Sequence, residues 1–245
     1  MIEVRDLHKS FGDNQVLRGI DLNIEDGETL TILGRSGSGK TVLLKNIVGL
    51  MKPDKGWVSI DGVNISSASR RQKFALRRQM GFVFQSAALF DSMTVYQNLA
   101  LPLAEARFPK DEIEDRVRRA LEMVDMADTQ NLFPAELSGG MKKRVGVARA
   151  IVAQPKYIFY DEPTTGLDPI TADTICDLIK HLDQVLGTTS VVVSHDMHLA
   201  TKVSDRIVLI SQGEIAFNGN PEQAMNQGPD SPVSRFIQAT KLLVP

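Results

Sequence analysis

Hydrophobic and polar residues alternate over about the first sixty positions, with the two-residue period of half-buried β-strands. One alternating run begins at Ile2 and Val4, and a second covers residues 16–24 and ends before a turn at Gly27. A third run is TLTIL at residues 29–33, which is more continuously apolar. The pattern therefore predicts a strand-rich N-terminal region.

Helical spacing and continuous apolar runs alternate in the rest of the chain. Residues 111–126 place apolar side chains three and four positions apart, and residues 139–153 are also compatible with a helix. The runs YIFY at 157–160 and SVVVSH at 190–195 enclose a third, amphipathic helix. Its apolar face is predicted to carry Ile175, Leu178, Ile179, Leu182 and Val185. Continuous apolar runs between helices indicate parallel strands that are buried on both faces.

Near the C-terminal end, the pattern changes to RIVLISQGEIAFNG at residues 206–219. It predicts two short strands joined by a hairpin around Gln212 and Gly213. The tail that follows, residues 221–245, leaves little room for a regulatory domain.

The charge of the chain is nearly balanced. It has 28 Lys and Arg against 30 Asp and Glu, a net charge of -2, which gives no general attraction for nucleic acid. The basic run RRQKFALRR at residues 70–78 is therefore interpreted as a solvated helix face. The single cysteine, Cys176, excludes an internal disulfide. No apolar stretch reaches the roughly 18 residues of a spanning helix, so a membrane role would require a partner.

A phosphate-binding loop is predicted between a strand and a helix. Residues 34–41 read GRSGSGKT, which fits the pattern G-x-x-x-x-G-K-[ST] of the P-loop. Its glycines let backbone N–H groups approach phosphate oxygens, and the helix dipole favours the same charge. Lys40 is expected to reach the β and γ phosphates, and Thr41 to bind Mg²⁺. The residues expected to contact the nucleotide are Gly34, Ser36, Gly37, Ser38, Gly39, Lys40, Thr41 and Val42.

Two acids follow the apolar run YIFY. A P-loop needs a second Mg²⁺ anchor at the end of another buried strand, and Asp161 stands at such a place. Its neighbour Glu162 would accept a proton from the attacking water, because consecutive residues in an extended chain point in different directions.

The stretch LSGGM at residues 137–141 predicts a second phosphate reader. Ser138, Gly139 and Gly140 would offer a hydroxyl and two unobstructed N–H groups at the start of a helix. A P-loop alone could belong to a small-molecule kinase, a GTPase or a helicase. With two phosphate readers in one chain, we expect a head-to-tail dimer in which LSGGM of one copy closes over the γ-phosphate held by the other.

Six motifs in this order resemble those of ABC transporter ATPase subunits, over nearly the whole chain. They are GRSGSGKT, Gln85 in VFQS, LSGGM, YIFYDEP, GLD at residues 166–168, and His195 in VVVSHD. The resemblance implies ATP and Mg²⁺ as ligands, with Gln85 contacting the metal or water and sensing a membrane partner. It further implies that Asp168 works across the dimer interface and that His195 positions the γ-phosphate. Phe11 stands where the family stacks an aromatic on adenine; core packing is the alternative.

One position departs from the family pattern, because Met141 stands where glutamine is usual. LSGGM, FQSAALFDSMTVYQNLALPL and DEPTTGLDPIT are similar to the ATPases of bacterial Mla-type phospholipid transporters, which are associated with MCE-domain proteins. This narrower resemblance implies a permease, an MCE-domain partner, a small STAS-domain partner and phospholipid as cargo.

The expected fold is therefore α/β, a P-loop NTPase of the ABC type with a parallel-sheet core, an antiparallel N-terminal sheet and an inserted helical subdomain. We expect residues 1–85 and 156–220 to form the nucleotide-binding core, residues 86–155 the helical subdomain and residues 221–245 a tail.

The expected function is ATP hydrolysis that drives a membrane transporter, at the cytoplasmic face of the bacterial inner membrane. An amino-acid, metal or drug cargo is the alternative to phospholipid. A mechanochemical ATPase of DNA repair or translation is a further rival, but such proteins need a coiled coil or a second cassette for which this chain has no room.

Overall fold

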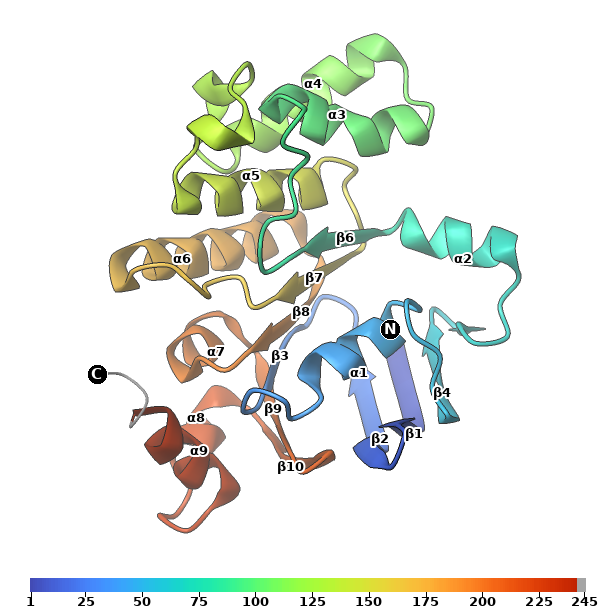
Figure 1. The fold of residues 1–245 in the computed structure, drawn as a ribbon, viewed down its shortest axis with the longest axis vertical. Helices are drawn as coiled ribbons and strands as arrows, with labels where there is room; N and C mark the ends of the chain where they lie inside the picture. The colour runs from blue at the N-terminus through green and yellow to red at the C-terminus, as the bar shows by residue number, and fades with distance from the viewer. Residues whose placement is uncertain (242–245) are drawn as a thin grey trace. The chain divides into compact units, whose positions relative to one another are not determined.

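The computed structural model describes residues 1–241 of the 245-residue chain (Figure 1). The chain divides into two compact units. The P-loop unit comprises Met1–Arg77 and Thr189–Pro245, and the LSGGM unit comprises Arg78–Thr188. The helical subdomain expected at residues 86–155 falls within the LSGGM unit, and its boundaries stay a prediction.

The N-terminal part of the P-loop unit is an antiparallel sheet, as the expected fold has it, and its strands lie where the alternation of residues predicts them. Its strands are β1 (Ile2–Phe11), β2 (Asn14–Ile24), β4 (Lys55–Ile60) and β5 (Val63–Asn64), in the order β2-β1-β4-β5. Ile2 lies opposite Ile24, and Val4 lies opposite Leu22, so buried apolar side chains pair across the strands.

The second group of strands in this unit centres on β3 (Thr29–Leu33), which is buried throughout. β3 pairs in parallel with β8 (Thr189–Ser194) and β9 (Arg206–Ser211), as the continuous apolar runs predict. β10 (Glu214–Gly219) pairs antiparallel with β9 and completes the predicted hairpin. Gln212 and Gly213 both have positive φ, 52° and 83°, which tight two-residue hairpins require.

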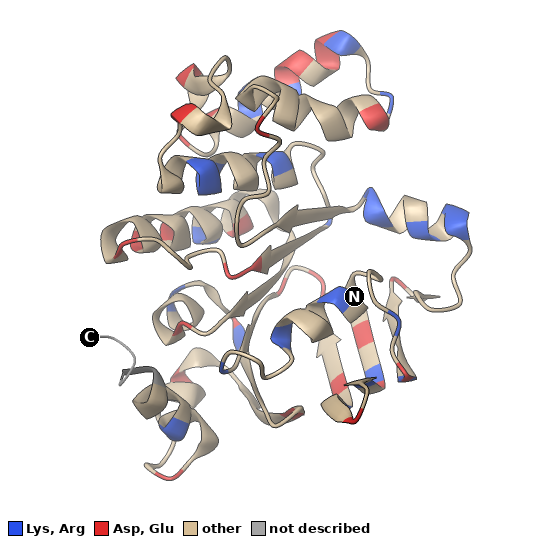
Figure 2. Cartoon of the chain, in the orientation of Figure 1, with Lys and Arg blue, Asp and Glu red and all other residues tan. Residues whose placement is uncertain are grey.

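Helices complete the P-loop unit. They are α1 (Lys40–Ile47), α2 (Arg70–Arg77), α7 (Met197–Val203), α8 (Pro221–Met225) and α9 (Pro232–Lys241). α2 exposes Arg70, Arg71 and Arg77, and Figure 2 shows the helix with basic and no acidic residues, in agreement with the predicted solvated face. α9 packs Val233 and Phe236 into a cluster that includes Leu33 and Leu209. No helix of residues 1–241 is both long and apolar enough to cross a membrane.

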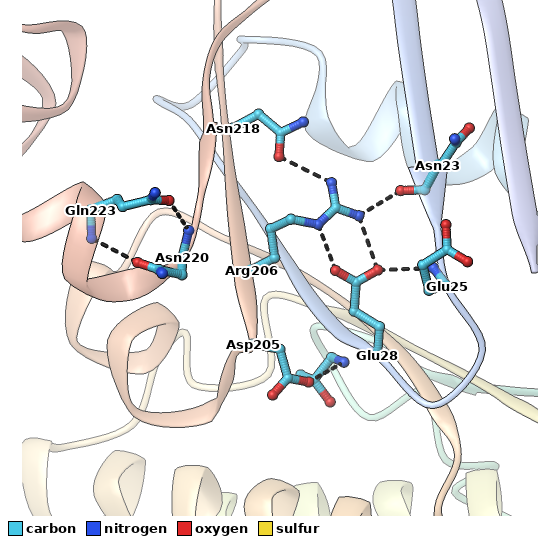
Figure 3. Close-up of polar contacts among 9 residues, drawn as sticks. Asn23, Glu25, Glu28, Asp205, Arg206, Asn218, Asn220 and Gln223 are labelled. Carbon is cyan, nitrogen blue, oxygen red and sulfur yellow. Dashed lines mark hydrogen bonds and ion pairs between the residues drawn. The ribbon is translucent and has the colours of Figure 1, made fainter.

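Arg206, the first residue of β9, makes hydrogen bonds to neighbouring segments of the P-loop unit through its guanidinium group (Figure 3). Arg206 donates to both carboxylate oxygens of Glu28, from Nε at 2.5 Å and from Nη2 at 2.9 Å. It also donates to the Asn218 amide oxygen at 3.0 Å and to the Asn23 carbonyl oxygen at 2.6 Å. The bidentate pair is largely buried, so it joins β2, β9 and β10 at the amino end of β3.

The LSGGM unit consists of two parallel strands and a set of helices. The strands are β6 (Met80–Val83) and β7 (Tyr157–Asp161). The helices are α3 (Val95–Glu105), α4 (Lys110–Glu122), α5 (Gly139–Ile151) and α6 (Pro169–Leu186), with short 3-10 turns at Ala127–Thr129 and Pro134–Glu136. The helix predicted at 111–126 ends earlier, at Glu122, because the chain turns through Asp125 with φ of 55°.

One residue of the predicted face of α6 is misplaced. Ile175, Leu178, Ile179 and Leu182 are buried, but Val185 is 57% exposed. Val185 lies in the last turn of α6, which ends at Leu186 before Gly187 in the left-handed conformation, so the apolar stripe continues beyond Leu182, the last buried residue of the helix.

Close packing of β6 on α5 gives a stability prediction. A Cβ at Gly81 would overlap the carbonyl oxygen of Ala150, whereas nothing lies within 4 Å of one at Gly228. Gly81→Ala is expected to lower the free energy of unfolding by about 1–3 kcal/mol, and Gly228→Ala by less than about 0.5 kcal/mol. Urea denaturation of both variants measures the difference, and equal stabilities would contradict this packing.

Candidate nucleotide site

Glycines shape the loop between β3 and α1. A Cβ at Gly34 would meet the Ser38 hydroxyl and lie 2.8 Å from the Ile210 carbonyl oxygen. Gly39 caps α1 with φ of 101°, a conformation that side chains disfavour. The first and last positions of the loop therefore favour residues without a Cβ.

The Lys40 side chain and the Ser38 hydroxyl oxygen are buried at this loop. Lys40 is 6% exposed, and its Nζ donates to the carbonyl oxygens of Gly34 at 2.8 Å and Arg35 at 3.2 Å. The Ser38 hydroxyl oxygen is buried without a hydrogen-bond partner in the described part of the chain. Such a group costs about 1–3 kcal/mol when it is left unsatisfied. A phosphate oxygen would accept its proton, so the loop fits a polyphosphate.

His195 emerges at the same strand edge as the P-loop. Leu33 of β3 pairs with Ser194 of β8, so the residues that follow them, Gly34 and His195, both leave the carboxyl ends of parallel strands. Ligands of α/β proteins bind at this edge. His195 is exposed, and the next residue, Asp196, caps α7 by accepting from the His198 N–H at 2.8 Å.

Phe11 does not pack in the core. It ends β1 opposite Asn14 and is 50% exposed, which rules out the core-packing alternative. Lys9 Nζ lies 5.7 Å from the centroid of its ring. Farther along β2, the Val16 carbonyl oxygen would lie 3.1 Å from a Cβ at Gly39, so this strand adjoins the P-loop. An exposed ring can stack on a base, and that role stays a prediction.

A cleft of about 800 Å³ adjoins the tip of the P-loop. Its lining includes the loop itself, from Arg35 to Ser38, and α9, with Pro232, Arg235 and Phe236. The expected tail at residues 221–245 therefore contributes to the surroundings of the phosphate loop, as far as the structure describes it.

In the LSGGM unit, the predicted acids stand at a corresponding strand edge. β6 and β7 are parallel with Val83 opposite Tyr160, so Gln85 and Asp161 both follow at the carboxyl ends. Asp161 is the last residue of β7, and both it and Glu162 are half-buried, whereas Gln85 is exposed.

Glu162 has an unusual backbone. Its φ of 51° lies in the left-handed region, which a residue with a long side chain rarely adopts. The Thr165 hydroxyl donates to Glu162 Oε2 at 3.0 Å, and Lys143 Nζ donates to the Glu162 carbonyl oxygen at 3.3 Å. Strained backbone held by its surroundings is typical of functional sites.

The LSGG residues begin α5 as predicted. Ser138 is the N-cap, and its Oγ accepts from the Met141 N–H at 3.2 Å. A Cβ at Gly140 would lie 2.7 Å from Thr171 Cγ2 of α6, so this glycine also permits close helix packing. Asp168 caps α6, and hydrogen bonds from the Thr171 hydroxyl and backbone lower the pKa of its carboxyl.

Sequence reasoning missed three features of these surroundings: the P-loop wall formed by α9, the buried Lys143, and the packing of Met141. Met141 lines a hollow of about 450 Å³ together with Met126, Thr129 and Arg144 of the same unit. The apolar spacing of Val233, Phe236 and Ile237 could have indicated that α9 packs on the core.

A family model described as ABC transporter, ABC_tran, matches residues 17–165. The chain belongs to the ABC transporter family. Among its relatives, the methionine import ATP-binding protein MetN of Brucella abortus is 39% identical over 237 residues, which cover 97% of this chain and 64% of MetN. The "Probable ribonucleotide transport ATP-binding protein mkl" of Mycobacterium leprae is 36% identical over 242 residues, 98% of this chain and 70% of that protein.

A solved ABC structure has the same fold. It is the dimeric ATP-binding cassette MJ0796 in a post-hydrolysis state bound to ADP and Pi, with 33% identity and a TM-score of 0.81, covering 90% of this chain and 99% of that one. This likeness confirms the expected fold class. The chain thus spans about two thirds of the MetN length and nearly all of this cassette. None of the three names refers to phospholipid.

Proposed function

We propose that the chain is the ATP-hydrolysing subunit of a membrane ABC transporter. The observation that carries the proposal is the P-loop, in which the buried Lys40 and the unpartnered Ser38 hydroxyl surround a backbone loop suited to phosphate. Membership of the ABC family, and a cassette of the same fold that binds ADP and Pi, support ATP as the substrate.

The residues divide the chemistry as follows. Lys40 and the loop amides bind the β and γ phosphates, and His195 contacts the γ-phosphate from the neighbouring strand end. Glu162 accepts a proton from the attacking water. Thr41, Gln85 and Asp161 offer a hydroxyl, an amide and a carboxylate oxygen, the donors that Mg²⁺ prefers. Bound there, Mg²⁺ would neutralise charge on the phosphates.

The working form is a head-to-tail dimer. Ser138, Gly139 and Gly140 present a hydroxyl and N–H groups at the start of α5, where they would contact the γ-phosphate held by the partner copy. MJ0796 is a dimeric cassette, which supports this assembly. Asp168 would work across the same interface.

For the cargo, the relatives favour import of a small polar molecule. MetN is named for methionine import and mkl for ribonucleotide transport, and both match almost the whole of this chain. Phospholipid, with MCE-domain and STAS-domain partners, is the second candidate and rests on LSGGM and the flanking segments alone. In either case the permease would hold this subunit at the cytoplasmic face of the membrane.

Co-purification from the native cell tests both parts of the proposal. The chain is tagged, extracted in mild detergent, and analysed for associated proteins and solvent-extractable lipid. We expect an integral membrane permease together with a solute-binding protein for a small polar cargo. An MCE-domain protein with enriched phospholipid would instead establish the second candidate, and the absence of any membrane protein would contradict the transporter assignment.

A further inference from the structure

One face of α5 holds the segment that follows β6. Lys143, Gly146 and Arg149 lie on this face, three residues apart. Arg149 donates from Nη1 to the Ala88 carbonyl oxygen at 2.7 Å and from Nη2 to that of Ala87 at 2.8 Å. A Cβ at Gly146 would lie 3.1 Å from the Ala87 Cβ, so the two segments are in close contact. The segment is therefore attached to the helix at two points.

Lys143 attaches α5 to the residues at the carboxyl ends of β6 and β7 as well. Its side chain is buried, with 6% exposed, and its Nζ donates to the Gln85 carbonyl oxygen at 2.5 Å and to the Glu162 carbonyl oxygen at 3.3 Å. Burial lowers the pKa of Lys143, while the carboxylates of Glu162 and Asp161 oppose that shift. One cation thus joins α5 to the residues that follow β6 and β7.

The two hydrogen bonds of Lys143 hold the main chain at Gln85 and Glu162, not their side chains. The ammonium group has three donors and no acceptor, which suits two converging carbonyl oxygens. Both acceptors belong to the peptide groups of residues proposed to act on the attacking water and Mg²⁺. Glu162 has a positive φ, and its carbonyl oxygen accepts from both the Thr165 N–H and Lys143 Nζ at 3.3 Å, so Lys143 adds a second bond to a strained backbone.

The same helix begins at the phosphate reader of the LSGGM motif. Ser138 is the N-cap of α5, and Lys143 follows five residues later, about 7.5 Å along the axis at 1.5 Å per residue. A helix of this length moves as a rigid element, so a displacement of Ser138 reaches Lys143 and the two carbonyl groups bound to it.

We propose that Lys143 is a positioning residue that links the two nucleotide sites of the dimer. In a head-to-tail dimer, Ser138 serves the ATP held by the partner, whereas Gln85 and Glu162 serve the ATP held by their own chain. Contact of Ser138 with the γ-phosphate at one site therefore fixes, through α5 and Lys143, the backbone positions of Gln85 and Glu162 at the other site. This inference rests on the proposed dimeric ATPase.

Steady-state ATP hydrolysis, measured against ATP concentration, tests the link. We expect a Hill coefficient above about 1.3 for the native chain. Lys143→Met should bring it close to 1 and lower kcat about 10- to 100-fold, as expected for losing charge-assisted hydrogen bonds, with KM changed less than about threefold. Lys143→Arg should recover much of the cooperativity and of kcat, because a guanidinium can donate to two carbonyl oxygens.

Lys142→Met is the matched control. Lys142 is the preceding cation of α5, and its side chain has no hydrogen bond within the described residues, so its loss should leave the Hill coefficient and kcat at native values. Thermal melts separate folding from function: a merely structural role would lower kcat in proportion to the folded fraction and leave the Hill coefficient unchanged.

A double-mutant cycle with Ser138→Ala gives a second readout. If both residues act through α5, the double variant should be slower than the slower single variant by less than about twofold. A folded Lys143→Met protein with native cooperativity, a native chain without cooperativity, or losses that multiply in the cycle would each overturn the link. Absence of ATP hydrolysis or of an ATP-dependent dimer in the native chain would instead refute the proposed function itself.

Discussion

Glu162→Gln should lower the rate of ATP hydrolysis by at least about 100-fold, the contribution typical of a general base. The amide keeps the shape of the side chain but cannot accept the proton of the attacking water. ATP binding should persist, because the P-loop lies in the other unit and keeps its Lys40 and Ser38. Bound ATP should therefore accumulate and hold the dimer closed.

Phosphate release measures the loss of turnover, and size-exclusion chromatography with ATP and Mg²⁺ measures the dimer. Glu105→Gln, an exposed residue at the end of α3, removes a charge from the same unit and should leave both at native values. Hydrolysis by Glu162→Gln at more than a tenth of the native rate would mean that another group activates the water.

Lys40→Ala should weaken ATP binding by about 10- to 100-fold, as expected for losing a charge-assisted hydrogen bond to phosphate. The change removes the buried cation and also its hydrogen bonds to the carbonyl oxygens of Gly34 and Arg35, so the loop loses two bonds of its own as well. Hydrolysis should fall with it.

Equilibrium binding of a fluorescent ATP analogue measures this effect. Lys45→Ala, at an exposed position of the same helix, controls for the loss of a cation near the loop. An affinity within about twofold of native for Lys40→Ala would remove Lys40 from the site.

Local sequence patterns were enough to predict most of the fold and the positions of the motifs in it. The alternation at Ile2 and Val4 predicted a strand, because side chains on one face of that strand are buried. The hairpin at Gln212 and Gly213 was likewise readable, since a glycine between two apolar runs is typical of a tight turn. The P-loop followed from glycine spacing between a strand and a helix, all within a few residues of one another.

What the patterns missed depends on tertiary structure. Lys143 reads as one base among several in MKKRV, and only the fold places its ammonium group beside the carbonyl oxygens of Gln85 and Glu162, residues distant in sequence. The positive φ of Glu162 and the place of α9 beside the P-loop likewise depend on tertiary structure. Val185 shows the opposite error, where a periodic pattern continues past the neighbours that could bury it.

The pair of Arg206 and Glu28 cross-links the strands of the P-loop unit at one end of β3 only. Leu30 pairs with Arg206, so the guanidinium network lies at the amino end of β3, while Gly34 and His195 leave from the carboxyl ends. Local opening needs least free energy where cross-links are fewest. Amide protons near Arg206 should thus exchange slowly with or without nucleotide, and those of residues 34–39 should slow only once a phosphate fills the loop.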